Sequence, residues 1–217
     1  MPINLTTVFE TKDKTASFQV GSYPNRDFLV QCVSNIKLLD HPPIRTRQGM
    51  GKQNRNIGFF SNVSNGYSYS GQVMHSQPLT SELDQLLQQI NEEFKADYNG
   101  ILINEYLPPN DYLSAHSDDE RSLGNIGVLG IVLNYAQPRT FRIRAKMPTT
   151  IQFTDGLGRE TETSFKGEKE IVRDFEFVDC SIYLMSGDFQ KIFEHEVPIR
   201  KKCSGKRISF TFRKHLE

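Results

Sequence analysis

The chain has 217 residues, with 26 basic and 26 acidic side chains and a formal net charge of zero. This length allows one domain with a hydrophobic core, and the balanced charge excludes a surface that is basic throughout. The three cysteines, Cys32, Cys180 and Cys203, form no Cys-x-x-Cys pair, which disfavours a disulfide framework and a zinc knuckle. Without an apolar leader or a run long enough for a membrane span, we expect a soluble intracellular protein, cytoplasmic or nuclear, with no membrane contact.

The first part of the chain predicts two strands followed by a helix. Residues 8–10 and 16–20 alternate between apolar and polar side chains, as strands do, and apolar residues recur at helical spacing over 28–36. Pro42-Pro43 then breaks the pattern. We therefore expect residues 1–43 to form an N-terminal extension packed on a core made by residues 44–217.

Residues 45–65 are polar and rich in Gly and Asn. Four cations lie within eleven residues: Arg45, Arg47, Lys52 and Arg55. This composition is typical of a solvated loop, and it equally suits a mobile lid whose cations meet phosphates. Tyr67 and Tyr69 lie two residues apart on one strand face, where their rings would frame a base.

A helix and then a series of short strands are predicted for the rest of the chain. Residues 81–94 carry apolar side chains at a spacing of 3.6 residues and form the clearest helix. The strands that follow are 101–107, 112–118, 127–133, 141–144, 151–155, 170–177, 181–185 and 193–197. We expect 151–155 and 170–177 to form a hairpin around the polar connection 156–167. Many short strands separated by turn signals favour a sandwich or a barrel.

One short motif has the residue types of a metal site. His116 and Asp118 are two residues apart, so on an extended strand both side chains point to the same side. A distant histidine would complete a set of two imidazoles and one carboxylate, which holds Fe(II) and leaves other positions open. His195 is the candidate. Each of these residues alone is more often an ordinary surface or hydrogen-bonded residue.

The C-terminal run from 207 to 213 alternates strictly. One face is apolar, and the other carries two guanidiniums and two hydroxyls: Arg207, Ser209, Thr211 and Arg213. Two guanidiniums on one strand face suit a small dianion, because each can form a pair of hydrogen bonds to a carboxylate. Asn104 and Tyr106 also share a strand face and would add hydrogen bonds to the same ligand.

These motifs together resemble the AlkB family of Fe(II)- and 2-oxoglutarate-dependent dioxygenases. The likeness covers about residues 44–215, in the family's order and at roughly its spacing, and the stretch 67–71 resembles the substrate-lid element of the repair members. The resemblance implies a mainly β (α+β) fold, the double-stranded β-helix, which is related to the jelly roll. One or two buttressing helices and an N-terminal substrate lid at about 44–75 complete it.

The resemblance also implies roles for the site residues. His116, Asp118 and His195 are the expected iron ligands, with 2-oxoglutarate in two further positions, dioxygen in the last and ascorbate as reductant. Arg207, helped by Tyr106 and Thr211, is expected at the distal carboxylate. Arg213 and Asn104 are expected at the keto-acid end. Ser209 stands where family members often carry Asn, so its contact is shorter or mediated by water.

The substrate implied by the resemblance is methylated DNA or RNA. In repair members an acidic pair, here Asp119 and Glu120, faces the base, although an exposed turn is an equally good interpretation. Tyr67, Tyr69 and Arg142 are further candidates for substrate contact. We expect a monomeric oxidative demethylase that removes N-alkyl groups from bases and releases formaldehyde, succinate and CO2. The alternatives are an oxygenase acting on a protein or small molecule, and a catalytically silent β-sandwich.

Overall fold

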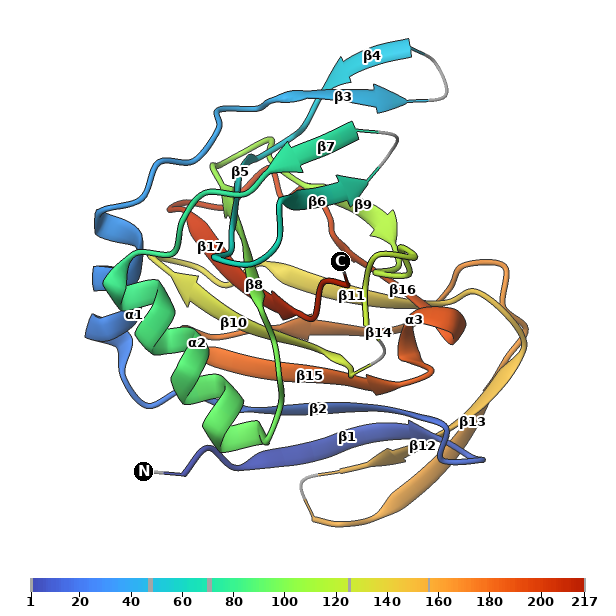
Figure 1. Cartoon of the computed structure of the whole chain (residues 1–217). Helices are drawn as coiled ribbons and strands as arrows, with labels where there is room; N and C mark the ends of the chain where they lie inside the picture. The colour runs from blue at the N-terminus through green and yellow to red at the C-terminus, as the bar shows by residue number, and fades with distance from the viewer. Residues whose placement is uncertain (1, 47–48, 70–71, 125, 156, 217) are drawn as a thin grey trace.

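The computed structural model describes residues 2–46, 49–69, 72–124, 126–155 and 157–216, without the side chains of residues 46, 68, 69 and 72. Two antiparallel sheets make up the body (Figure 1). The nine-stranded sheet has the order β13-β12-β1-β2-β15-β10-β17-β8-β5, and the four-stranded sheet has the order β14-β11-β16-β9. The predicted mainly β architecture is confirmed.

The element bounds are as follows. The larger sheet contains β1 (Leu5–Thr11), β2 (Ala16–Ser22), β5 (Asn56–Phe60), β8 (Gly100–Tyr106), β10 (Val128–Asn134), β12 (Thr149–Thr154), β13 (Glu160–Phe165), β15 (Ser181–Gly187) and β17 (Arg207–Arg213). The smaller sheet contains β9 (Leu113–His116), β11 (Thr140–Ala145), β14 (Glu170–Glu176) and β16 (Phe193–Val197). Two hairpins, β3 (Pro43–Thr46) with β4 (Gly49–Lys52) and β6 (Gly66–Tyr69) with β7 (Gln72–His75), lie at one end of the molecule (Figure 1). The helices are α1 (Arg26–Ser34), α2 (Ser81–Phe94) and α3 (Phe189–Ile192).

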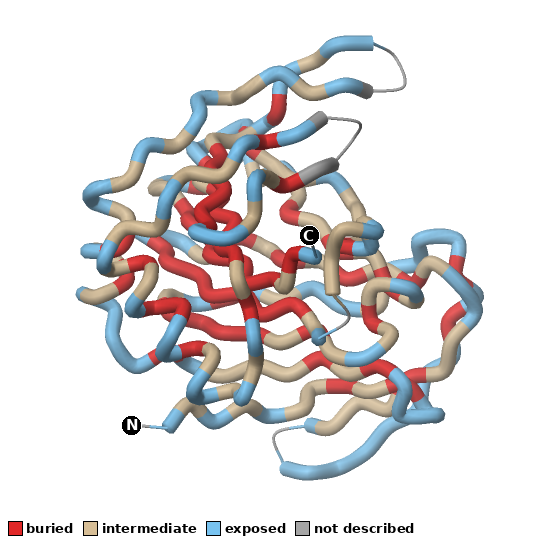
Figure 2. The backbone as a smooth tube through the Cα atoms, in the orientation of Figure 1, coloured by how far each residue is buried: buried red, intermediate tan, exposed pale blue. Residues whose placement is uncertain are grey.

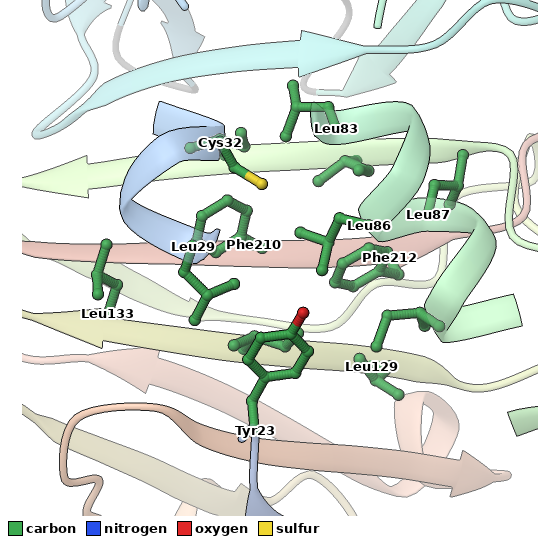
Figure 3. Packing of buried hydrophobic residues seen from close by; sticks show 14 of the residues in the cluster. Tyr23, Leu29, Cys32, Leu83, Leu86, Leu87, Leu129, Leu133, Phe210 and Phe212 are labelled. Carbon is green, nitrogen blue, oxygen red and sulfur yellow. The ribbon is translucent and has the colours of Figure 1, made fainter. Parts of the chain in front are cut away.

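The core has two layers, one on each face of the larger sheet. Between the sheets, phenylalanines of β1 and β2 pack with those of β11 and β16. On the opposite face, α1 and α2 cover β10 and β17 through leucines of the helices and Phe210 and Phe212 of β17 (Figure 3). Figure 2 shows that the most buried backbone runs through these central strands. Because β17 alternates, the side chains that it does not give to the helices point into the space between the sheets.

Helices α1 and α2 begin where a side chain caps them. Thr80 accepts a hydrogen bond from the Leu83 N–H at 3.2 Å, and α2 spans the predicted residues 81–94. In α1 the Asn25 side chain accepts from the Phe28 N–H at 3.1 Å, so this helix begins two residues before the predicted 28–36. No helix in the described part of the chain has the length and apolar character that a membrane crossing needs.

The predicted hairpin between 151–155 and 170–177 is wrong. β12 pairs with β13, which lies inside the stretch predicted to be a polar connection, and β14 pairs with β11 in the other sheet. β13 is an edge strand of mostly exposed Glu, Thr and Ser side chains. Such a strand is held by backbone hydrogen bonds and carries little apolar signal.

The N-terminal segment is built into the larger sheet. β1 pairs with β12 and β2 pairs with β15, so these two strands lie between β12 and β15 in the sheet. The predicted extension, residues 1–43, thus contributes two strands to the sheet that carries β17. The domain boundary at residue 43 remains a prediction.

Candidate active site

A cavity of about 540 Å³ lies between the two sheets, under the two hairpins. Its wall comes from β8 and β17 of the larger sheet, from β9 and β16 of the smaller sheet, and from the segment that joins β4 to β5. This volume is in the range of small-molecule sites. Nearly all the residues predicted for the metal and the co-substrate lie in or beside it.

The two histidines are brought together by strand pairing. His116 ends β9 and His195 lies in β16, and the two are register partners with ring centroids 4.3 Å apart. Asp118 lies two residues beyond the end of β9, so it reaches them from a loop and not from the predicted strand. Candidate ligand atoms of the three residues lie within 4.8 Å of one another. The predicted ligand set is therefore assembled in space, and its metal role remains a prediction.

The contacts of these three residues suit a divalent metal. His116 Nδ1 lies 3.0 Å from the Ser114 carbonyl, which only accepts, so Nδ1 donates to it, while Nε2 faces Asp118 Oδ1 at 3.5 Å. Burial, with the neighbouring His116, lowers the pKa of His195 to about 3, so this imidazole is neutral at physiological pH. Burial alone would raise the pKa of Asp118, but Arg213 and the two histidines hold it well below its ordinary value.

One carboxylate oxygen of this set has no partner among the described residues and is free to bind a metal. Asp118 Oδ2 is buried and accepts no hydrogen bond from any described residue, and the Nε2 atoms of His116 and His195 lie 3.5 and 3.9 Å from its carboxylate oxygens. Two imidazoles and a carboxylate around one point are the facial set that Fe(II) accepts. These residues therefore fit a ferrous ion.

The six residues predicted for 2-oxoglutarate lie on two neighbouring strands. Across β8 and β17, Tyr106 is the register partner of Arg207 and Asn104 is the register partner of Ser209. All six are buried: Asn104, Tyr106, Arg207, Ser209, Thr211 and Arg213. The alternation of β17 therefore predicted correctly which side chains share the cavity face, while their contacts with the co-substrate remain predictions.

Arg207 is a buried cation that forms no ion pair with any described residue. Only 2% of it is exposed, and its Nε and Nη1 atoms find no hydrogen-bond partner among the described residues. Its guanidinium lies 5.1 Å from the centre of the Tyr106 ring. A buried charge left in this state is costly, so the site is complete only with a ligand that brings negative charge.

Arg213 has a partner within the chain. Its Nη2 lies 2.5 Å from Asp118 Oδ1, both side chains are buried, and its Nε and Nη1 have no partner in the described structure. Burial opposes the charge of Arg213, but the adjacent carboxylate raises its pKa above the ordinary value. This arginine thus orients a predicted iron ligand. Its predicted contact with the keto-acid end remains a prediction.

A residue of the lid segment reaches the floor of the cavity. Arg55 donates from Nε to Asn104 Oδ1 at 2.7 Å. The sequence singled out Arg55 only as one cation of a basic stretch, because nothing local indicates that it contacts a residue 49 positions away. Gln190 was missed entirely. It accepts the Asp118 N–H at 2.9 Å, and it lies in the one-turn helix α3, whose length gives no periodic signal.

The predicted substrate residues lie in different surroundings. Tyr67 is buried, donates to Glu120 Oε1 at 2.5 Å, and lies with its ring centre 4.9 Å from the Arg213 guanidinium. Asp119 is exposed and lies 3.3 Å from Lys146 Nζ. Both acidic residues line the cavity. The side chain of Tyr69 is outside the described residues.

Arg142 lies on β11 within an ion-pair group. Its Nε and Nη2 atoms lie 2.7 Å from the two carboxylate oxygens of Asp174, and Nη1 lies 3.5 Å from Glu196. Asp174 stands opposite Arg142 in the register of β14. The predicted substrate contact of Arg142 remains a prediction, and a substrate phosphate would have to compete with these carboxylates.

Comparisons with known proteins agree with this site. The family model of the 2OG-Fe(II) oxygenase superfamily matches residues 25–213. "DNA oxidative demethylase ALKBH2" of Bos taurus is 27% identical over 150 residues, which is 69% of this chain and 49% of that protein. "Alpha-ketoglutarate-dependent dioxygenase alkB homolog 3" of Rattus norvegicus is 28% identical over 148 residues, covering 68% of this chain and 46% of that protein. The chain thus spans about half the length of these relatives.

A solved structure shows the same fold. The crystal structure of an oxidoreductase of the 2OG-Fe(II) oxygenase family from Burkholderia pseudomallei aligns with a TM-score of 0.50 at 10% identity. The alignment covers 92% of this chain and 84% of that chain. The double-stranded β-helix expected from the sequence, the resemblance to AlkB-type dioxygenases, and the expected iron, 2-oxoglutarate and dioxygen are therefore confirmed.

Proposed function

The chain belongs to the 2OG-Fe(II) oxygenase superfamily, and from this membership we propose that it is an oxidative demethylase of N-alkylated nucleic-acid bases. The observation that carries the proposal is the likeness to a DNA oxidative demethylase over 150 residues, together with two carboxylates in the cavity wall.

We assign the metal to the His116, Asp118 and His195 side chains. When bound, the ferrous ion and 2-oxoglutarate use dioxygen to place one oxygen atom in a substrate C–H bond, and the co-substrate leaves as succinate and CO2. The two imidazoles and the ionised carboxylate provide the donor atoms that this ion needs. Arg213 keeps the carboxylate ionised by its direct contact with Oδ1.

We assign the distal carboxylate of 2-oxoglutarate to Arg207. The buried guanidinium, with two nitrogen atoms that lack partners in the described chain, offers the paired donors that a carboxylate accepts. Tyr106 stands opposite Arg207 in the strand register, Thr211 lies further along the same cavity face of β17, and Arg213 contacts Asp118. We assign Tyr106 and Thr211 to the distal carboxylate with Arg207, and Asn104 with Arg213 to the keto-acid end. Ser209, across from Asn104, is short enough to leave space for a water-mediated contact.

The substrate side of the cavity favours a cationic base. Glu120 and Asp119 contribute negative charge, and Tyr67 holds Glu120 in the wall. Methylation of a ring nitrogen such as N1 of adenine gives a base with positive charge, which opposite charges attract. Oxidation of the N-methyl group to N-hydroxymethyl consumes one dioxygen and one 2-oxoglutarate. The hydroxyl group then loses its proton and the C–N bond breaks, with its electron pair going to the ring nitrogen, so that formaldehyde and the neutral base are released.

A panel of methylated oligonucleotides tests the proposal. The protein, with iron, ascorbate and 2-oxoglutarate, should remove methyl groups from 1-methyladenine or 3-methylcytosine in single strands, where the base is already unstacked. Mass spectrometry follows the loss of each methyl group, and formaldehyde is measured in parallel. The His116→Ala variant is the control and should be inactive. Turnover of 2-oxoglutarate with every oligonucleotide unchanged would refute the demethylase and favour a protein or small-molecule substrate.

A further inference from the structure

The three residues that follow His116 are all tied to one part of the molecule. Ser117 Oγ donates to the Phe193 carbonyl at 2.9 Å, and the Asp118 N–H donates to Gln190 Oε1 at 2.9 Å. Asp119 lies 3.3 Å from Lys146 Nζ. These partners come from α3, the start of β16 and the residue just after β11, which lie together in the chain's fold (Figure 1). A loop without regular structure is thus fixed along its whole course past the metal-binding residues.

Lys146 uses its whole ammonium group in this arrangement. A protonated lysine has three donors, and Nζ has three acceptors within reach: Ser117 Oγ at 2.9 Å, the Gln190 carbonyl at 3.0 Å and Asp119 Oδ2 at 3.3 Å. Its backbone N–H also donates to the Ile192 carbonyl at 2.8 Å. The ammonium group of Lys146 is therefore directed into the protein.

Two contacts, one at each polar atom, orient the side-chain amide of Gln190. Its Nε2 lies 3.5 Å from Met185 Sδ, a weak acceptor, which leaves Oε1 facing the Asp118 N–H. Gln190 lies five residues before His195, so the same short stretch that leads to one histidine also holds the backbone of the carboxylate. The strand pairing of β9 with β16 fixes the histidines, but it ends before Asp118. Gln190 replaces the missing ladder contact at that residue.

We propose that Gln190 and Lys146 are positioning residues for Asp118, holding its loop so that the carboxylate meets the metal and Arg213 at once. The inference rests on the assignment of iron to the His116, Asp118 and His195 set. Neither residue touches the metal. Outer contacts of this kind usually change metal affinity by about 10- to 100-fold when removed, because the ligand then spends less time in the binding geometry.

Cobalt(II) binding to the purified whole chain tests the inference without substrate or turnover. The variant Gln190→Met keeps the length and packing of the side chain but removes the acceptor, and Lys146→Met removes the ammonium. Lys191→Met is the matched control, because Lys191 lies on the same short helix, is mostly exposed and pairs only with Asp188 among the described residues. Titration gives the dissociation constant, and the visible Co(II) spectrum reports the coordination geometry.

Gln190→Met and Lys146→Met should each bind Co(II) about 10-fold or more weakly than wild type, with a changed spectrum, while Lys191→Met matches wild type. Far-UV circular dichroism verifies that each variant is folded, and either of the two substitutions suffices if the other prevents folding. Wild-type affinity and spectrum in the folded variants would overturn the inference. Failure of wild type itself to bind Co(II) would refute the iron site of the proposed function. Failure of demethylation alone, with the Co(II) results as expected, would refute only the substrate and leave this inference standing.

Discussion

Two strands of this protein each carry two arginines on one face, and the surroundings of these arginines differ. On β11, Arg142 and Arg144 have side chains 24% and 22% exposed, and both are paired with carboxylates on the flanking strands. On β17, Arg207 is 2% exposed and has two nitrogens that lack a partner in the described structure. In both strands, polar and apolar side chains alternate and the two arginines share the polar face. What differs is the neighbour: β14 and β16 offer Asp174 and Glu196, whereas β8 offers Tyr106 and Asn104.

The comparison teaches that two arginines on one strand face indicate a ligand site only where the neighbouring strands provide no carboxylate to pair with them. An exposed ion pair contributes little to stability and does not require a ligand. A buried guanidinium without an acid stores an unfavourable charge that a bound dianion relieves. Arg213 stands between these cases, because it is buried and its acid is itself a predicted iron ligand.

The largest effect is expected from Arg213→Met, which leaves the Asp118 carboxylate buried without a cation. We expect the metal-free protein to lose about 3–5 kcal/mol in the free energy of unfolding, as is usual when one partner of a buried ion pair is removed. Urea denaturation measures it, and 2-oxoglutarate turnover should be lost as well. A variant within about 1 kcal/mol of wild type would mean that the pair in the metal-free protein is not a strong interaction.

Arg207→Met separates the ligand role from stability. We expect the KM for 2-oxoglutarate to rise at least about 30-fold, because removing one side of a buried charge contact costs about 2–5 kcal/mol of binding. The metal-free variant should be at least as stable as wild type, since a buried charge without an acid is replaced by an apolar chain. Steady-state succinate formation and urea denaturation give the two values. An unchanged KM would remove Arg207 from the co-substrate site.

Arg142→Met is the counterpart on β11, with a smaller expected effect. The free energy of unfolding should fall by less than about 1 kcal/mol, because the pair with Asp174 is partly exposed. The KM for 2-oxoglutarate should not change. The salt dependence of oligonucleotide binding sharpens this prediction: a lower slope in the variant would show that Arg142 contacts a phosphate despite its carboxylate partners.

The smallest effect on stability is expected from His41, which lies just before the β3–β4 hairpin and contacts two aspartates. His41 Nε2 lies 3.0 Å from Asp111 and Nδ1 lies 2.6 Å from Asp40, and these contacts raise its pKa. The raised pKa means that the folded state binds the proton more tightly, so this stabilisation is present below the unfolded pKa of about 6.5 and disappears as pH rises through the folded pKa.

His41→Gln should therefore be less stable than wild type at pH 5.5 and nearly equal to it at pH 9. Thermal unfolding at several pH values measures the difference. A gap that stays constant across this range would show that the histidine acts through packing and not through its charge.

Much of the site followed from local pattern. The alternation from 207 to 213 identified the cavity face of β17, and the two-residue spacing of His116 and Asp118 predicted that they converge, with His195 added as a distant third member that the structure places beside them. The fold class followed from turn signals, and α2 from its apolar spacing. These features succeed because strand and helix periods are local properties of the chain.

Other features had no local signal. The pairing of Arg213 with Asp118 joins residues 95 positions apart, and the contact between Gln190 and the Asp118 N–H joins residues 72 apart. β13 has the polar composition of a loop and becomes a strand only because β12 offers a free edge. The ion pairs that occupy Arg142 depend on which strands lie beside β11. Each of these outcomes is decided by tertiary neighbours, which periodicity does not report.

The most direct test of the account is a calorimetric titration of 2-oxoglutarate into the protein loaded with Mn(II), which stands in for Fe(II) and avoids turnover. We predict one bound 2-oxoglutarate per chain in wild type and Arg142→Met, with at least about 10-fold weaker binding when Mn(II) is omitted or Arg207 is replaced by Met. Equal affinity in all four samples would contradict the claim that a metal held by two histidines and an aspartate, with one buried arginine, forms the co-substrate site.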